Sequence, residues 1–188
     1  LSSPPGDSST GKCLPNPGPF PKGPRDIKQK EAKRMSIAEN IARVRADIAA
    51  AAKEAGRRPE EITLVGASKM NAAAACREAV AAGIDALGEN RVQEMTAKFQ
   101  EHAYDGAPLH FIGHLQRNKV KQVVGKASLI QSAGSLELLE EIEKAAGRLE
   151  LVQDILLEVN IGEEEAKSGF LPSMLLSGAE AALKQDHI

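Results

Sequence analysis

The feature that most constrains the fold is an alternation, from residue 62 onward, between short apolar runs and stretches with helical periodicity. The apolar runs have the length of strands and lie at Ile62–Ala67, Ile84–Gly88, Leu109–Gly113, Ser128–Ser132 and Ile155–Asn160. Each precedes a stretch with helical character, at Ala72–Ala82, Arg91–His102, Gln116–Val124, Ser135–Ala146 and Pro172–Lys184. Apolar strands that alternate with helices predict a parallel sheet covered by helices. The pattern alone leaves open a doubly wound sheet or a (β/α)8 barrel.

A further helix is expected before the first strand. Residues Ser36–Ala55 carry apolar side chains at helical spacing, and Ser36 with Glu39 has the spacing of a capping box. Gly56 supplies a stop signal at the other end. Because the chain has four Phe, one Tyr and no Trp, its core must be built mainly from Ala, Val, Ile and Leu.

The first 34 residues differ in composition from the rest. They hold seven of the ten prolines, and seven Lys and Arg against three Asp and Glu. Such a segment buries too little apolar surface to offset the entropy of ordering its backbone, so residues 1–34 are expected to be disordered and residues 35–188 to form the folded domain. Met35-Ser36 resembles a natural start. A basic interaction tail is the alternative interpretation of the segment.

Composition excludes several classes of protein. The formal net charge of −2 disfavours a dedicated nucleic-acid binder. No apolar run reaches the length of about 18 residues that a membrane span needs. Cys13 and Cys76 lack partners at the spacing of zinc ligands, so neither a disulfide scaffold nor a metal site is expected.

Polar residues follow the predicted strands, where chemistry in parallel sheets is located. They are Lys69, Asn90, His114, Gln131, Ser132 and Asn160. A partly desolvated lysine at such a position can act as an amine nucleophile toward a carbonyl and form a Schiff base. The alternative for Lys69 is a side chain that extends its ammonium into solvent. His110 is interpreted as a packed or capping histidine and Cys76 as an inert buried residue.

Five segments together resemble a known family. They are Leu64–Lys69, Leu87–Glu94, His110–Lys119, Gln131–Ser132 and Val159–Gly162, of which His110–Lys119 is the most specific. Over essentially all of residues 35–188 the chain resembles the pyridoxal phosphate homeostasis protein family, which has the TIM-type barrel of the alanine racemase N-terminal domain. The resemblance implies pyridoxal 5′-phosphate (PLP) as ligand, held as a Schiff base on Lys69, with Asn90 near the cofactor and His114 at the same edge of the sheet.

The resemblance also implies a non-catalytic carrier in the cytoplasm that balances vitamin B6, with PLP-dependent apoenzymes as possible recipients and no nucleic-acid or membrane partner. A PLP-dependent racemase or decarboxylase is the enzyme alternative, and an interaction protein that uses the basic tail is a third. Met70-Asn71 and Gly134 depart from the family pattern, in which a Thr and an Asp are usual.

Five βα units are too few to close an eight-stranded barrel. The segments that bind the phosphate in the later strands of the family have no counterpart in this sequence. We therefore expect an incomplete barrel, a truncated product prone to aggregation whose affinity for PLP is reduced, with a non-functional fragment as a further alternative.

Overall fold

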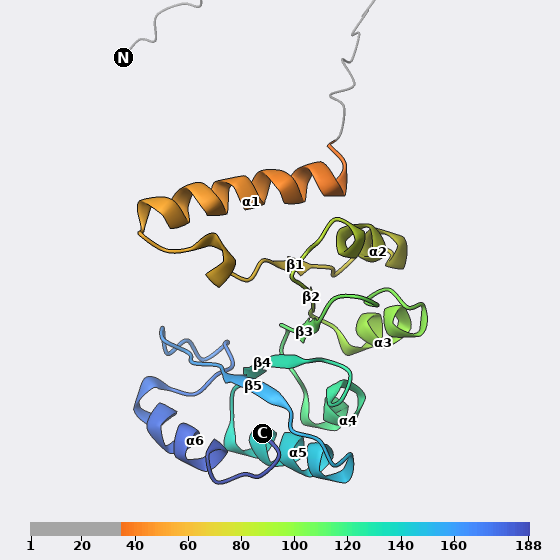
Figure 1. The fold of residues 1–188 in the computed structure, drawn as a ribbon. Coiled ribbons are helices and arrows are strands. Elements are labelled where there is room, and N and C mark those ends of the chain that lie inside the picture. The colour runs from red at the N-terminus through yellow and green to blue at the C-terminus, as the bar shows by residue number, and fades with distance from the viewer. Residues whose placement is uncertain (1–34) are drawn as a thin grey trace, which may run out of the picture. The chain divides into compact units, whose positions relative to one another are not determined.

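The computed structural model describes residues 35–188. The predicted disorder of residues 1–34 and the environment of Cys13 lie outside the described residues. Figure 1 shows a curved sheet with α2, α3 and α4 stacked along one side of the strands and α5 and α6 beyond β5.

The elements follow the predicted alternation. The strands are β1 (Val65–Ala67), β2 (Ala86–Glu89), β3 (Leu109–Phe111), β4 (Leu129–Ala133) and β5 (Asp154–Leu157). The α-helices are α1 (Ile37–Glu54), α2 (Ala73–Ala81), α3 (Val92–Gln100), α4 (Val120–Val123), α5 (Leu136–Arg148) and α6 (Leu175–Ala182). Short 3-10 turns lie at η1 (Pro59–Glu61), η2 (Arg117–Lys119) and η3 (Pro172–Met174).

All neighbouring strands pair in parallel, in the order β1-β2-β3-β4-β5. Sequential order without a reversal is the arrangement of a barrel wall, whereas a doubly wound sheet reverses its strand order at a switch point. The prediction of five βα units of an incomplete barrel is confirmed.

The core lies between the strands and the helices that cover them. Phe111 on β3 and Ile130 on β4 are completely buried, together with Met95 on α3, Val123 on α4 and Leu139 on α5. The other face of the sheet is less covered, and Leu156 on β5 is 50% exposed there. The apolar strands predicted from the sequence are thus buried on the helix side.

Two predicted helices are shorter than expected. The stretch at Gln116–Val124 contains the 3-10 turn η2 and only one turn of α-helix, α4. Pro172–Lys184 likewise begins with the 3-10 turn η3 before α6. Proline is tolerated in the first turn of a helix, which explains why the helical part of the second stretch begins at Pro172.

Helix α1 begins as the sequence predicts. Ser36 Oγ accepts the Glu39 N–H at 3.1 Å, and the Glu39 carboxylate accepts the Ser36 N–H at 2.7 Å, which completes the capping box. Ile41 is buried against the core, whereas Val44 is 37% exposed. The apolar stripe of α1 is therefore narrower than the sequence pattern indicates.

An ion pair connects α1 to the start of β2. Arg45 donates to Asp85 at 2.8 Å and to the Gly83 carbonyl, and the other Asp85 oxygen accepts the Leu64 N–H at 2.6 Å. The Arg45 hydrogen bond, aided by the Leu64 N–H, holds the pKa of Asp85 below its usual value. Asp85 thus joins α1, the entry to β1 and the entry to β2.

We expect Asp85→Asn to lower the free energy of unfolding by at most about 1 kcal/mol near neutral pH, because both charged side chains are more than one third exposed to water. A depressed folded-state pKa contributes stability above the ordinary Asp value of 3.8, and this stability is lost as the pH falls through the lower folded value. Urea unfolding at several pH values should show the wild-type advantage shrinking below about pH 4. A constant advantage into strong acid would contradict the assignment.

None of the helices between residues 35 and 188 combines the length and hydropathy that crossing a membrane requires. In the same part of the chain, no group of three His, Cys, Asp or Glu side chains is arranged to hold a metal ion.

Candidate functional site

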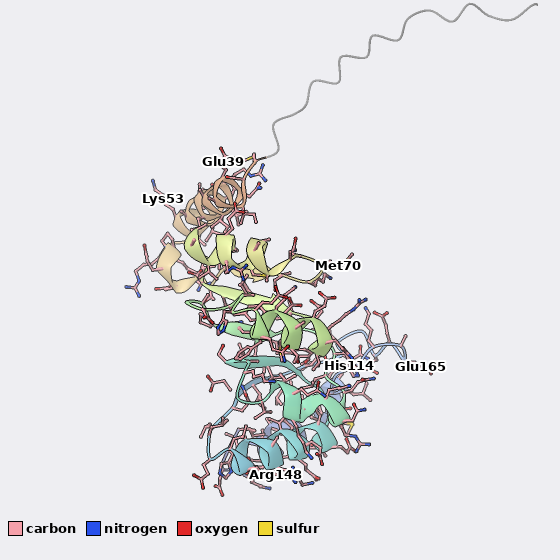
Figure 2. The ribbon with its side chains drawn as sticks, turned by 90° about the vertical axis from the view of Figure 1, so that its right-hand side faces the viewer. Glu39, Lys53, Met70, His114, Arg148 and Glu165 are labelled. Atoms are coloured by element: carbon pink, nitrogen blue, oxygen red, sulfur yellow. The ribbon has the colours of Figure 1, made fainter. Side chains whose placement is uncertain are left out.

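The predicted site residues follow the carboxyl ends of the first three strands. Lys69 lies in the turn after β1, Asn90 directly after β2, and His114 three residues after β3. Figure 2 shows Met70, the neighbour of Lys69, on the same side of the molecule as His114, with Lys53 toward the opposite side. We call this edge of the sheet the rim.

The backbone around Lys69 is held on both sides, but its side chain is exposed. The Ser68 N–H donates to the Gly88 carbonyl at 2.9 Å, and the Asn71 N–H donates to the Ser68 carbonyl at 3.1 Å and so closes a turn around Lys69. The side-chain carboxamide of Asn71 donates to the Lys69 carbonyl at 3.1 Å. Across residues 35–188 the Lys69 ammonium forms no ion pair. Hydrogen bonds thus fix the backbone around Lys69, while its side-chain amine is exposed and forms no ion pair in the described part of the chain.

Asn90 and His114 line one pocket of about 220 Å³ beyond the carboxyl ends of β2 and β3. Arg91 and Lys119 also line it and bring positive charge to its edge. The Asn90 carboxamide oxygen is buried, and no hydrogen-bond donor reaches it from the described residues. The structure brings two of the three predicted residues together, while Lys69 is not part of this lining. A buried acceptor without a partner is costly unless a ligand or water supplies a donor.

His114 also borders a larger pocket of about 560 Å³ near the ends of β4 and β5. Its lining includes Ser132 and Glu158, each with a buried oxygen that lacks a partner among the described residues. Gly134 lies here too: a Cβ would stand 3.0 Å from Gly169 Cα. A side chain at this position would therefore require the Gly169 backbone to move by a few tenths of an ångström.

Two other polar residues predicted at strand ends form hydrogen bonds within the protein. Gln131 contacts His110 Nδ1 at 3.0 Å, and burial lowers the pKa of His110, consistent with a packed, neutral histidine. Asn160 is buried and donates to the Glu164 carbonyl at 2.8 Å, while its own oxygen accepts the Glu164 N–H. It therefore organises the loop after β5.

A buried polar cluster beneath the Lys69 turn was not predicted from the sequence. Lys98 on α3 donates to the Glu89 carboxylate at 2.5 Å and to the Ser68 carbonyl at 2.7 Å. The same Glu89 oxygen accepts the Ser68 hydroxyl at 2.8 Å and the Tyr104 hydroxyl at 3.2 Å. Burial and the Glu89 charge raise the pKa of Tyr104, so its hydroxyl remains a donor. Cys76, predicted to be buried, is 2% exposed, and burial raises the pKa of its thiol.

The sequence feature from which this cluster could have been predicted is a charged residue at the last position of an apolar strand. Glu89 ends β2 and has no exposed surface, and Lys98 on α3 is 7% exposed. Strand alternation directs Glu89 toward the helices, on the face of its β3 partner Phe111. A carboxylate there needs a cationic partner on the covering helix.

Comparisons with known proteins agree with this arrangement. The family model of the alanine racemase N-terminal domain matches residues 36–188. The pyridoxal phosphate homeostasis protein of Aquifex aeolicus is 40% identical over 154 residues, which cover 82% of this chain and 68% of that protein. The Pseudomonas aeruginosa protein of the same name is 40% identical over 148 residues, covering 78% and 64%. The chain thus spans about two thirds of the length of these relatives.

Solved structures show the same likeness. PipY of Synechococcus elongatus with PLP bound is 30% identical with a TM-score of 0.67, covering 81% of this chain and 66% of PipY. An alanine racemase of Clostridium difficile, 16% identical with a TM-score of 0.58 over 69% of this chain and 34% of the racemase, shares the fold alone.

The parallel barrel wall, together with the family model that matches residues 36–188, defines an α/β protein of the alanine racemase N-terminal-domain type. That fold includes enzymes as well as proteins named for cofactor homeostasis. Within it, this chain belongs to the pyridoxal phosphate homeostasis protein family.

Proposed function

We propose that residues 35–188 bind PLP reversibly through Lys69 and hold the cofactor for transfer, without turning over a substrate. The observation that carries this proposal is the exposed Lys69 amine on a turn with a fixed backbone. Family membership supports it, since the PipY relative has a structure with PLP bound. A cytoplasmic location and delivery to PLP-dependent apoenzymes belong to the same proposal and rest on that membership.

The residues at the rim fit the chemistry of this cofactor. A primary amine such as Lys69 Nζ forms a carbon–nitrogen double bond with an aldehyde and releases water, and a second amine can displace it. The free oxygen of Asn90 can accept a hydrogen bond from a ligand in the adjoining pocket. Arg91 and Lys119 at the edge of that pocket provide positive charge for a phosphate ester.

Lys69→Ala tests the covalent attachment. We expect the variant to lose the visible absorbance of the lysine adduct and to bind PLP about 100-fold more weakly, a loss of about 2.7 kcal/mol. Borohydride reduction followed by peptide mass analysis should place the trapped PLP on Lys69 of the wild type. Lys53→Ala is the matched control, because this exposed lysine lies on the opposite side of the molecule (Figure 2). Equal trapping on Lys53, or an unchanged adduct in Lys69→Ala, would refute the proposal.

A separate experiment distinguishes a carrier from a racemase. A carrier that has bound PLP should leave the α-proton of added amino acids in place when they are incubated in deuterium oxide. NMR measures this exchange directly. Exchange that depends on both PLP and Lys69 would favour the enzyme alternative.

A further inference from the structure

Helix α3 contacts the residues on both sides of Lys69. The Glu94 carboxylate accepts the Met70 N–H at 2.8 Å, and Lys98 donates to the Ser68 carbonyl at 2.7 Å. Glu94 and Lys98 are themselves one helical turn apart, with their charged atoms 3.7 Å from each other. One face of α3 therefore determines the backbone path immediately before and after Lys69.

The conformation of Met70 needs such support. Its φ of 62° lies in the left-handed region, which is unfavourable for a residue with a side chain. Its side chain is 87% exposed, so packing does not hold this conformation. A backbone strained in this way persists only where surrounding contacts impose it. The Asn71 N–H to Ser68 carbonyl bond closes the turn, and Glu94 holds the residue at its apex.

The charge on Glu94 strengthens this contact. The Met70 N–H is the main cause that lowers the pKa of Glu94, and the charges of Lys98 and Arg91 lower it further. The carboxylate is therefore ionised near neutral pH, and a hydrogen bond from an amide to an ionised carboxylate is stronger than one to a neutral acceptor.

We propose that Glu94 is a positioning residue for Lys69. By holding the Met70 N–H, Glu94 fixes the direction in which the Lys69 side chain leaves the turn, so that its amine is presented at the rim. This inference rests on the proposed function of Lys69. It also assigns a role to the segment Leu87–Glu94: Glu89 holds the Ser68 hydroxyl on one side of Lys69, and Glu94 holds the Met70 amide on the other.

Three variants test this role. Glu94→Ala removes the acceptor of the Met70 N–H, and Glu94→Gln keeps a neutral acceptor oxygen. Glu101→Ala is the matched control, an exposed glutamate directly after the end of α3. The readouts are the second-order rate constant of PLP capture on Lys69, the acetylation rate of Lys69 in competition with Lys53, hydrogen exchange of the Met70 amide, and the melting temperature.

We expect Glu94→Ala to capture PLP about tenfold more slowly and to exchange the Met70 amide faster, because a misplaced reacting group lowers the rate by one to two orders of magnitude. Glu94→Gln should recover most of the rate, and Glu101→Ala should behave as the wild type. Since Glu94 is partly exposed, the melting temperatures should remain similar. Wild-type capture and acetylation rates in Glu94→Ala would overturn the inference. A rate loss equal in the Ala and Gln variants would also overturn it.

The two proposals fail in different ways. If the wild type traps no PLP on Lys69, the proposed function is wrong and the inference falls with it. If the wild type and Glu94→Ala trap PLP on Lys69 equally fast, the proposed function stands and only the role of Glu94 is wrong.

Discussion

Lys98→Met is expected to lower the free energy of unfolding by about 3–5 kcal/mol, because it leaves the Glu89 carboxylate as an unpaired charge in the interior. The Glu89 side chain has no exposed surface and that of Lys98 is 9% exposed, so water compensates little for the lost ammonium. The hydroxyls of Ser68 and Tyr104 still donate to Glu89, but they carry no opposing charge. Urea unfolding followed by circular dichroism measures the loss.

The double variant Glu89→Gln with Lys98→Met separates this electrostatic effect from lost packing. Since the neutral amide removes the uncompensated charge, we expect the double variant to be more stable than Lys98→Met alone. Lys144→Met is the control: Lys144 is 54% exposed and lies 3.6 Å from both Glu140 and Glu141, so its loss should change the stability by less than about 1 kcal/mol. Two results would contradict the predicted importance of the buried pair. One is a loss of unfolding free energy in Lys98→Met no larger than that in Lys144→Met. The other is a loss in the double variant equal to the sum of the losses in Glu89→Gln and Lys98→Met.

The sequence predicts the sheet well because alternation and periodicity are local properties. Leu87, Phe111 and Ile130 stand in apolar runs, and all three are buried against the helices. The same reasoning locates Lys69, Asn90 and His114 at strand ends, since topology carries each strand end to one edge. It does not bring Lys69 into the pocket of the other two, because side-chain placement depends on contacts that periodicity does not describe.

The polar contacts beneath Lys69 are the part that could not be predicted. Glu89 and Lys98 are nine residues apart, on different elements, and a charged residue on a helix is usually solvated. The left-handed conformation of Met70 could not be predicted either, because methionine is not a residue type that is typical of a positive φ. Both features depend on how α3 packs against the ends of β1 and β2.

The segment His110–Lys119 contains Gly113, a position at which the fold leaves no room for a side chain. A Cβ at Gly113 would lie 2.6 Å from Asn90 Cα and 2.7 Å from its carbonyl carbon, and closest to its carbonyl oxygen. These are backbone atoms, so a rotamer change cannot relieve the overlap. The Ile112 N–H donates to the Glu89 carbonyl at 2.8 Å and fixes the spacing of the two segments.

Gly113→Ala is therefore expected to cost about 3 kcal/mol in the free energy of unfolding, at the upper end for an overpacked site. Gly66→Ala is the matched control within the sheet, because its Cβ would find only side-chain atoms at ordinary contact distances of 3.4–3.5 Å. Thermal and urea unfolding of both variants would measure the difference. If the two alanine variants unfold alike, β2 and β3 can separate at the rim without cost. If only Gly113→Ala is destabilised and its PLP capture also falls, the close approach of Gly113 to Asn90 maintains the shape of the site as well as the sheet.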